Sequence, residues 1–214
     1  FRGDSFLSVL QAEIEKWTGE LPKDPVQAIS KIIGRRLTLI VESAERRFEF
    51  WRRHYLDGQK LRSEGVDLTS YADILFGSDL DNNEYRQALS RYFSSEPVQK
   101  RQGLANLVRL AHDRFGGLVP RDREIEGRFF VHRCKQYGIS VDDLQAYLTP
   151  HREAFSAAMT IYMVESGCNV AVARTLFHDC IEETDIHGFR KITGYKARAR
   201  GKPIVINLPE DSKA

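Results

Sequence analysis

The sequence predicts a mainly α-helical protein with a small β-hairpin or sheet near its C-terminus. Apolar residues recur with i, i+3, i+4 spacing through most of the first 145 residues, and Gly, Pro, Asp and Asn interrupt them where helices would end. The stretches FRKITGY and PIVINL, by contrast, are β-branched and typical of strands. With 214 residues, 42% of them hydrophobic and 29% charged, the chain is ordinary in composition and long enough for one sizeable domain or two small ones.

A first helix is expected to begin after Asp4, whose side chain can cap it, and to end before Gly19 and Pro22. Its apolar residues lie near one face, and they are Phe6, Leu7, Leu10, Ile14 and Trp17.

A much longer helix is expected to begin at Asp24 and Pro25, which form a cap and first-turn pair. Gly34 is a point where this helix would bend, and a polar segment over residues 58–65 is expected to separate it from the next helix. Helical spacing is kept by Ile29, Ile32, Ile33, Leu37, Ile40, Val41, Ala44, Phe48 and Trp51.

Shorter helices are expected in TSYADILF, in EYRQALSRYF, and from Pro97 to a stop at Gly116 and Gly117. Two more are expected over residues 125–137 and 140–146, the second capped by Ser140. We place a domain boundary here. The sequence thus predicts a helical N-terminal domain over residues 1–145 and a second domain over residues 146–214.

Bulk charge indicates no particular partner, because 32 basic residues nearly balance 30 acidic ones. No apolar run approaches the length of a membrane span, and the first residues do not resemble a signal peptide, so a cytoplasmic protein is expected. Cys134, Cys168 and Cys180 stand in apolar neighbourhoods without metal-ligand spacing and are predicted to be reduced packing residues. The absence of an initial Met and the polar end NLPEDSKA suggest a piece of a longer protein.

Local basic clusters are the candidate nucleic-acid contacts. In the long helix, Glu42, Glu45 and Glu49 are placed to neutralise much of the positive field, so its arginines are either phosphate contacts or a solvated helix face. The arginine pairs of this helix are Arg35 and Arg36, Arg46 and Arg47, and Arg52 and Arg53.

A second basic cluster lies in and beside the predicted hairpin. It either grips phosphates or is simply a solvated turn. Its residues are Arg190, Lys191, Lys196, Arg198, Arg200 and Lys202.

The last third of the chain resembles the opening of the catalytic domain of tyrosine recombinases, the phage integrase family. The segment LTPHREAFSAAMTIYMVESGCNVAVARTLFHDCIE and the following hairpin carry this resemblance. The family pattern is matched at Gly167, Leu176 and Ile181 and nearly at Asp179, whereas its first catalytic arginine falls on Asn169.

The resemblance implies a helical core-binding domain followed by the first part of a catalytic domain. It implies cleavage and rejoining of duplex DNA through a 3′-phosphotyrosine, with no cofactor or metal and with self-association on DNA, in a prokaryotic cell, phage or mobile element. Lys196 would protonate the leaving oxygen, and Asn169, with Arg174 as the nearest compensating cation, would face the phosphate. The nucleophilic tyrosine would lie beyond Ala214, so this fragment alone would be inactive.

Two alternatives stay open. The chain is a DNA-binding or interaction module without catalysis, or it is an HD-type metal-dependent phosphohydrolase in which His178 and Asp179 join His132 and His151 around a metal. His187 and Arg190 have the H-x-x-R spacing of a later recombinase pair but stand too early for it.

Overall fold

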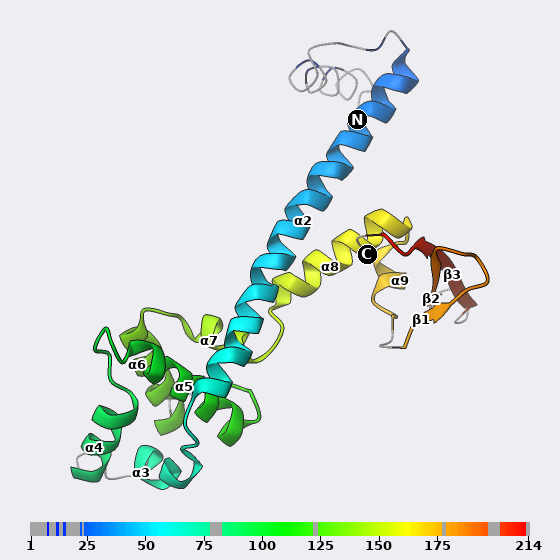
Figure 1. Cartoon of the computed structure of the whole chain (residues 1–214). Coiled ribbons are helices and arrows are strands. Elements are labelled where there is room, and N and C mark those ends of the chain that lie inside the picture. The colour runs from blue at the N-terminus through cyan, green and yellow to red at the C-terminus, as the bar shows by residue number, and fades with distance from the viewer. Residues whose placement is uncertain are drawn as a thin grey trace. The chain divides into compact units, whose positions relative to one another are not determined.

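The computed structural model describes residues 24–77, 83–121, 124–176, 179–196 and 202–212, with the isolated residues 8, 12, 15 and 22. Helices dominate this part, and a small antiparallel sheet lies near the C-terminus (Figure 1), which confirms the predicted fold class at that level. Contacts divide the chain into unit 1, residues 1–47 and 156–214, and unit 2, residues 48–155. The boundary predicted after residue 145 stays a prediction.

Helix α2 (Pro25–Glu64) is a single helix of 40 residues. It begins where the sequence predicts, since the Asp24 carboxylate accepts a hydrogen bond from the Val26 N–H at 3.0 Å, and it continues without a break through Gly34. The prediction that residues 58–65 form a polar separator is wrong, because the helix extends to Glu64.

Gly58 explains the error. A Cβ atom at Gly58 would lie 2.1 Å from the carbonyl oxygen of Tyr147 in helix α7 (Val141–Leu148). Glycine in a helix interior costs about 1 kcal/mol relative to alanine, and here that cost is offset by a backbone approach that no larger residue permits. In the sequence Gly58 therefore looks like a helix end, whereas in the fold it lies inside α2 and allows α7 to pack closely.

Unit 2 is a cluster of short helices around one core. Phe93, Leu107, Phe130 and Leu144 are each at most 1% exposed, and they bring together the elements between α2 and α7. Those elements are the 3-10 turn η1 (Thr69–Tyr71) and helices α3 (Ala72–Phe76), α4 (Asn83–Tyr92), α5 (Lys100–Phe115) and α6 (Ile125–Tyr137).

Several of the predicted helix ends are confirmed in detail. Ser140 and Asp143 form a capping box at the start of α7. Gly116 ends α5 in the left-handed conformation, with φ of 61°, and its N–H donates to the Ala111 carbonyl. These signals are local to one turn of chain, so the sequence alone suffices to read them.

Aromatic contacts hold the second half of α2 against the end of unit 2. The rings of Trp51 and His151 stack with centroids 3.8 Å apart, and Trp51 Nε1 donates to Glu153 Oε2 at 3.1 Å. His54 stacks on Tyr147 at 4.0 Å. The sequence predicts Trp51 only on an apolar helix face, and in the fold it also makes a specific polar contact.

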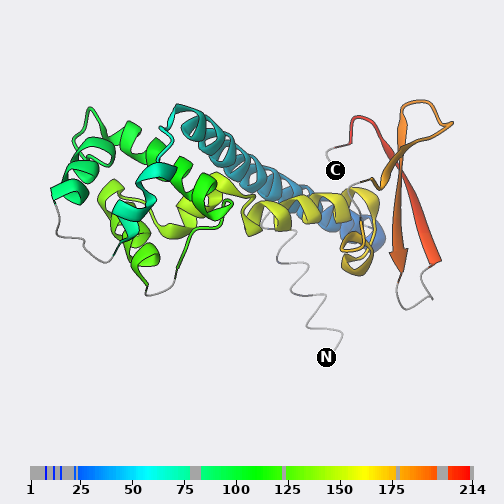
Figure 2. The ribbon, with the colours of Figure 1, turned by 90° about the horizontal axis from the view of Figure 1, so that it is seen from below.

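Unit 1 contains most of helix α8 (Arg152–Ser166), the short helix α9 (Val170–Ala173) and a three-stranded sheet in the order β1-β2-β3. Strands β2 (Phe189–Lys196) and β3 (Lys202–Pro209) form the predicted hairpin, seen as a long pair in Figure 2. The sequence did not predict β1 (Ile181–Glu183), which pairs antiparallel with β2 and is only three residues long.

The core of unit 1 lies between the sheet and helices α8 and α9. Ile192 and Leu208 from the sheet pack with Tyr162 and Ala173, and all four are at most 7% exposed. The two cysteines of this unit pack against the same cluster, and all three cysteines of the chain are free, as predicted.

Of the helices that the structure describes, none combines the length and apolar character that crossing a bilayer requires. The helix predicted to begin after Asp4 falls almost entirely outside the described residues.

Candidate nucleic-acid interface

The candidate interface is built from α9, the turn that precedes it and the end of the β2-β3 hairpin at Lys196 and Lys202. Helix α8 ends at Ser166, and Gly167 follows with φ of 65°, a conformation that favours glycine. The chain then enters α9 and returns through β1 to the hairpin. Gly167, singled out in the sequence, therefore makes the reversal that brings α9 onto the sheet.

Asn169 is the N-cap of α9. Its side-chain oxygen accepts a hydrogen bond from the Val172 N–H at 3.1 Å, and its backbone is extended, as a cap residue requires. The residue is exposed. Asn169 therefore caps α9, and a role toward phosphate stays a prediction.

We expect Asn169→Ala to lower the free energy of unfolding by about 1 kcal/mol, the usual cost of losing a cap. Asn169→Asp keeps an acceptor at the same place and should retain most of the stability. Urea denaturation followed by circular dichroism measures both variants. Equal stability of Asn169→Ala and the parent chain would show that the cap contributes nothing.

Strand β2 is fastened to the end of α9 by a threonine. The Thr175 hydroxyl oxygen accepts a hydrogen bond from the Tyr195 N–H at 2.9 Å and lies 2.9 Å from the Tyr195 carbonyl oxygen. One residue earlier, a Cβ at Gly194 would lie 2.7 Å from a methyl of Val172. We call this pair of contacts the Thr175 clasp. It fixes the strand that leads into the basic turn.

The clasp places two predicted site residues near each other along the backbone. Arg174 directly precedes Thr175, and Lys196 directly follows Tyr195, so the hydrogen bonds between Thr175 and Tyr195 bring their main chains together. Lys202 lies opposite Lys196 in the strand register. Arg174 and Lys202 are exposed, whereas the predicted contacts Arg198 and Arg200 lie outside the described residues.

Two other predicted DNA contacts are ion-paired. Arg190 Nε lies 3.1 Å from Glu210 Oε1, and its Nη1 lies 3.6 Å from Glu183 Oε1. Lys191 pairs with Glu182 on β1. These carboxylates reduce the positive potential that Arg190 and Lys191 offer to a phosphate, since a contact with DNA must compete with them.

The structure says less about the predicted role of the α2 arginines as phosphate contacts. Arg46 is exposed and lies in the half of α2 that belongs to unit 1. The neighbouring candidates Arg35, Arg36 and Arg47 take part in interactions within the protein. Their role as phosphate contacts stays a prediction.

The tyrosine nearest in sequence to α9 is unsuited to act as a nucleophile. Tyr162 is 7% exposed beneath the sheet, and burial raises the pKa of its phenol to about 12. Burial also raises the pKa of the Cys180 thiol. Both groups stay protonated at neutral pH and serve as core.

The metal hypothesis has no support among the described side chains. No group of three or more His, Cys, Asp or Glu residues among them is arranged to hold a metal ion. His151 stacks on Trp51, His132 lies on α6, and His178 is outside the described part of the chain.

Sequence reasoning missed the clasp. Thr175 belongs to no spacing pattern, and its partner is 20 residues away. Gly194 carried a signal, because a glycine inside a strand pattern often marks close approach of another backbone or side chain.

No family model matches the sequence, and neither a curated protein nor a solved structure matches it.

Proposed function

We propose that this chain binds duplex DNA through α9 and the end of the β2-β3 hairpin at Lys196 and Lys202, as part of a recombinase-like DNA strand-transfer protein. The observation that carries the proposal is the Thr175 clasp, which holds the main chains of Arg174 and Lys196 next to each other. The order of elements, an apolar helix, a reversal at glycine, a short helix and a basic hairpin, is the order that the resemblance to tyrosine recombinases implies.

The chemistry follows from the cations at this end of the sheet. The Arg174 guanidinium can donate to two phosphate oxygens at once. Lys196 would protonate the 5′ oxygen as it leaves phosphorus, while a tyrosine hydroxyl forms the 3′-phosphotyrosine bond. That tyrosine is assigned to no residue of this chain.

A second candidate function is DNA binding without catalysis. The capping bond of Asn169 favours it, since the side-chain oxygen is already engaged with Val172 and the residue brings no positive charge to a phosphate. Incubating the chain and any longer parent protein with a nicked duplex, and looking for a covalent complex on denaturing gels, separates the two functions. A covalent complex formed by a longer parent protein supports strand transfer. Binding by that protein without a covalent complex supports the second candidate, because the nucleophilic tyrosine is assigned to no residue of this chain.

Loss of the clasp should weaken DNA binding without any change of charge. We expect Thr175→Val to reduce the affinity for duplex DNA by about tenfold, because the strand loses its anchor beside α9 and the cations are no longer held together. Thr175→Ser keeps the hydroxyl and should restore the affinity. Fluorescence anisotropy with a labelled duplex at fixed salt measures all three proteins.

Thr160→Val is the matched control, since the Thr160 hydroxyl bonds only its own helix, at the Ser156 carbonyl. It should leave the affinity unchanged. If Thr175→Val and Thr160→Val bind DNA equally well, the clasp does not organise a DNA site.

A further inference from the structure

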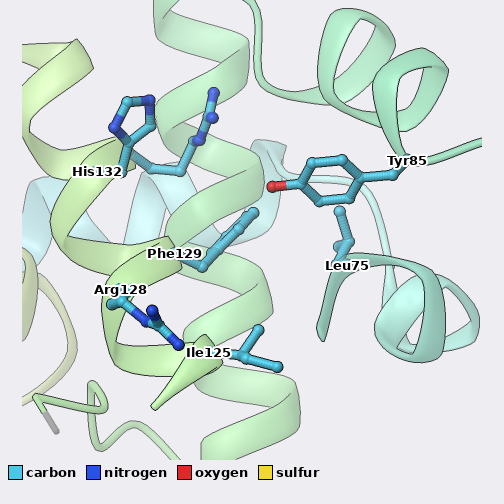
Figure 3. Close-up of a pocket in the computed structure, with 7 residues that line it drawn as sticks. Leu75, Tyr85, Ile125, Arg128, Phe129 and His132 are labelled. Carbon is cyan, nitrogen blue, oxygen red and sulfur yellow. The ribbon is translucent and has the colours of Figure 1, made fainter. Parts of the chain in front are cut away.

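Unit 2 contains a cavity of about 210 Å³ between α3, α4 and α6. In Figure 3 the Tyr85 ring reaches across from α4 with its hydroxyl directed toward α6, and Leu75 lies beside it. The α6 side is lined by Ile125, Arg128, Phe129, His132 and Arg133. This cavity is lined only by residues of unit 2, and none of them belongs to the interface proposed above.

The lining divides into an apolar floor and a cationic rim. Leu75 and Phe129 are 1% and 6% exposed and form the floor, whereas Arg128 and His132 are exposed on α6. None of the seven lining residues is acidic. An apolar floor with a few polar groups at its rim is the usual form of a small-molecule site.

Among the residues that line the cavity, Arg133 is the one whose surroundings point most directly to a bound anion. Its Nη1 donates to Gln136 Oε1, its guanidinium lies 5.7 Å from the Phe129 ring centroid, and its Nε is buried without a hydrogen-bond partner. Burial lowers its pKa. No carboxylate within the described ranges pairs with it, so the cost of burying this cation is only partly offset.

An anion in the cavity would supply the missing counter-charge. Two guanidinium groups and an imidazole offer more donors than the two oxygens of a carboxylate can use, and they suit the three terminal oxygens of a phosphate. The volume equals that of about seven water molecules at roughly 30 Å³ each, which suits a phosphate and one ring. The floor of Leu75 and Phe129 would receive that ring.

We infer that this cavity binds a small phosphate monoester carrying an apolar or aromatic group. Phenyl phosphate is the probe, and titration calorimetry on the whole chain should show saturable binding at least tenfold tighter than that of inorganic phosphate, because only phenyl phosphate also fills the floor. Benzoate has the ring without the phosphate and should bind at least tenfold more weakly than phenyl phosphate.

Arg133→Met keeps an unbranched apolar stem, removes the charge and should weaken phenyl phosphate binding by at least tenfold. Arg128→Gln changes an exposed residue and should weaken binding severalfold even where the substitution at Arg133 disturbs folding. Arg121→Met is the control, since Arg121 is a half-exposed arginine of the same unit that pairs with Asp142, and it should leave binding unchanged.

Several results would overturn the inference. They are an absence of saturable binding by the parent chain, equal binding by the parent and Arg128→Gln, and benzoate binding as tight as that of phenyl phosphate. Displacement of phenyl phosphate by excess duplex DNA would also overturn it, by making the cavity part of a DNA surface. Binding that survives the hairpin substitutions described below would support a site independent of the DNA interface.

Discussion

Replacing Lys196, Lys202, Arg198 and Arg200 together by Ala should reduce the affinity for duplex DNA by on the order of 10² to 10³-fold at about 0.1 M salt. Each lost phosphate contact removes roughly 0.9 from the slope of log K against log salt, so the slope should fall by up to about 3.6. Anisotropy titrations at four or five salt concentrations yield affinity and slope together. The slope is the decisive quantity, because it counts ionic contacts.

A matched pair of variants separates this site from a general effect of charge. The first double variant carries Lys196→Ala and Lys202→Ala, and the second carries Arg52→Ala and Arg53→Ala. Each variant removes two positive charges. Arg52 and Arg53 are already paired with Glu49 on α2, so their loss should change the slope little. If the two double variants have equal slopes of log K against log salt, the hairpin does not contact DNA.

Gly58→Ala should destabilise unit 2 by about 3 kcal/mol or more. The new Cβ would lie 2.1 Å from the Tyr147 carbonyl oxygen and 2.5 Å from the Tyr147 Cα. Both are backbone atoms, so no rotamer change relieves the clash, and α2 and α7 must separate. Overpacking of a well-packed contact costs about 1–3 kcal/mol and more where backbone must move.

Gly34→Ala is the control for that substitution. Gly34 lies in the same helix, and a Cβ added there would meet no atom within 4 Å. Alanine is the better helix former, so this variant should be more stable than the parent chain by about 0.5–1 kcal/mol. Thermal unfolding by circular dichroism measures both, and a Gly58→Ala protein as stable as Gly34→Ala would contradict the close packing of α7 on α2.

The candidate site was predictable to the extent that its parts are local. The hairpin strands and the cap at Asn169 follow from residue types in short stretches, and the structure has both. The ion pairs of Arg190 and Lys191 were not predictable, because their partners come from β1 and from the residue after β3. Partner choice across strands depends on register, which a single strand does not specify.

Residue types alone specify the mainly helical class, the start of α2 at Pro25 and the end of α5 at Gly116, since caps, prolines and left-handed glycines act within one turn of chain. Long-range packing, in contrast, establishes that Gly58 lies within a helix. It also establishes that Thr175 holds Tyr195. Each of these contacts is made with backbone from a distant part of the chain, Tyr147 for Gly58 and Tyr195 for Thr175. The sequence shows which residue type is present, but only the fold shows which neighbour it contacts.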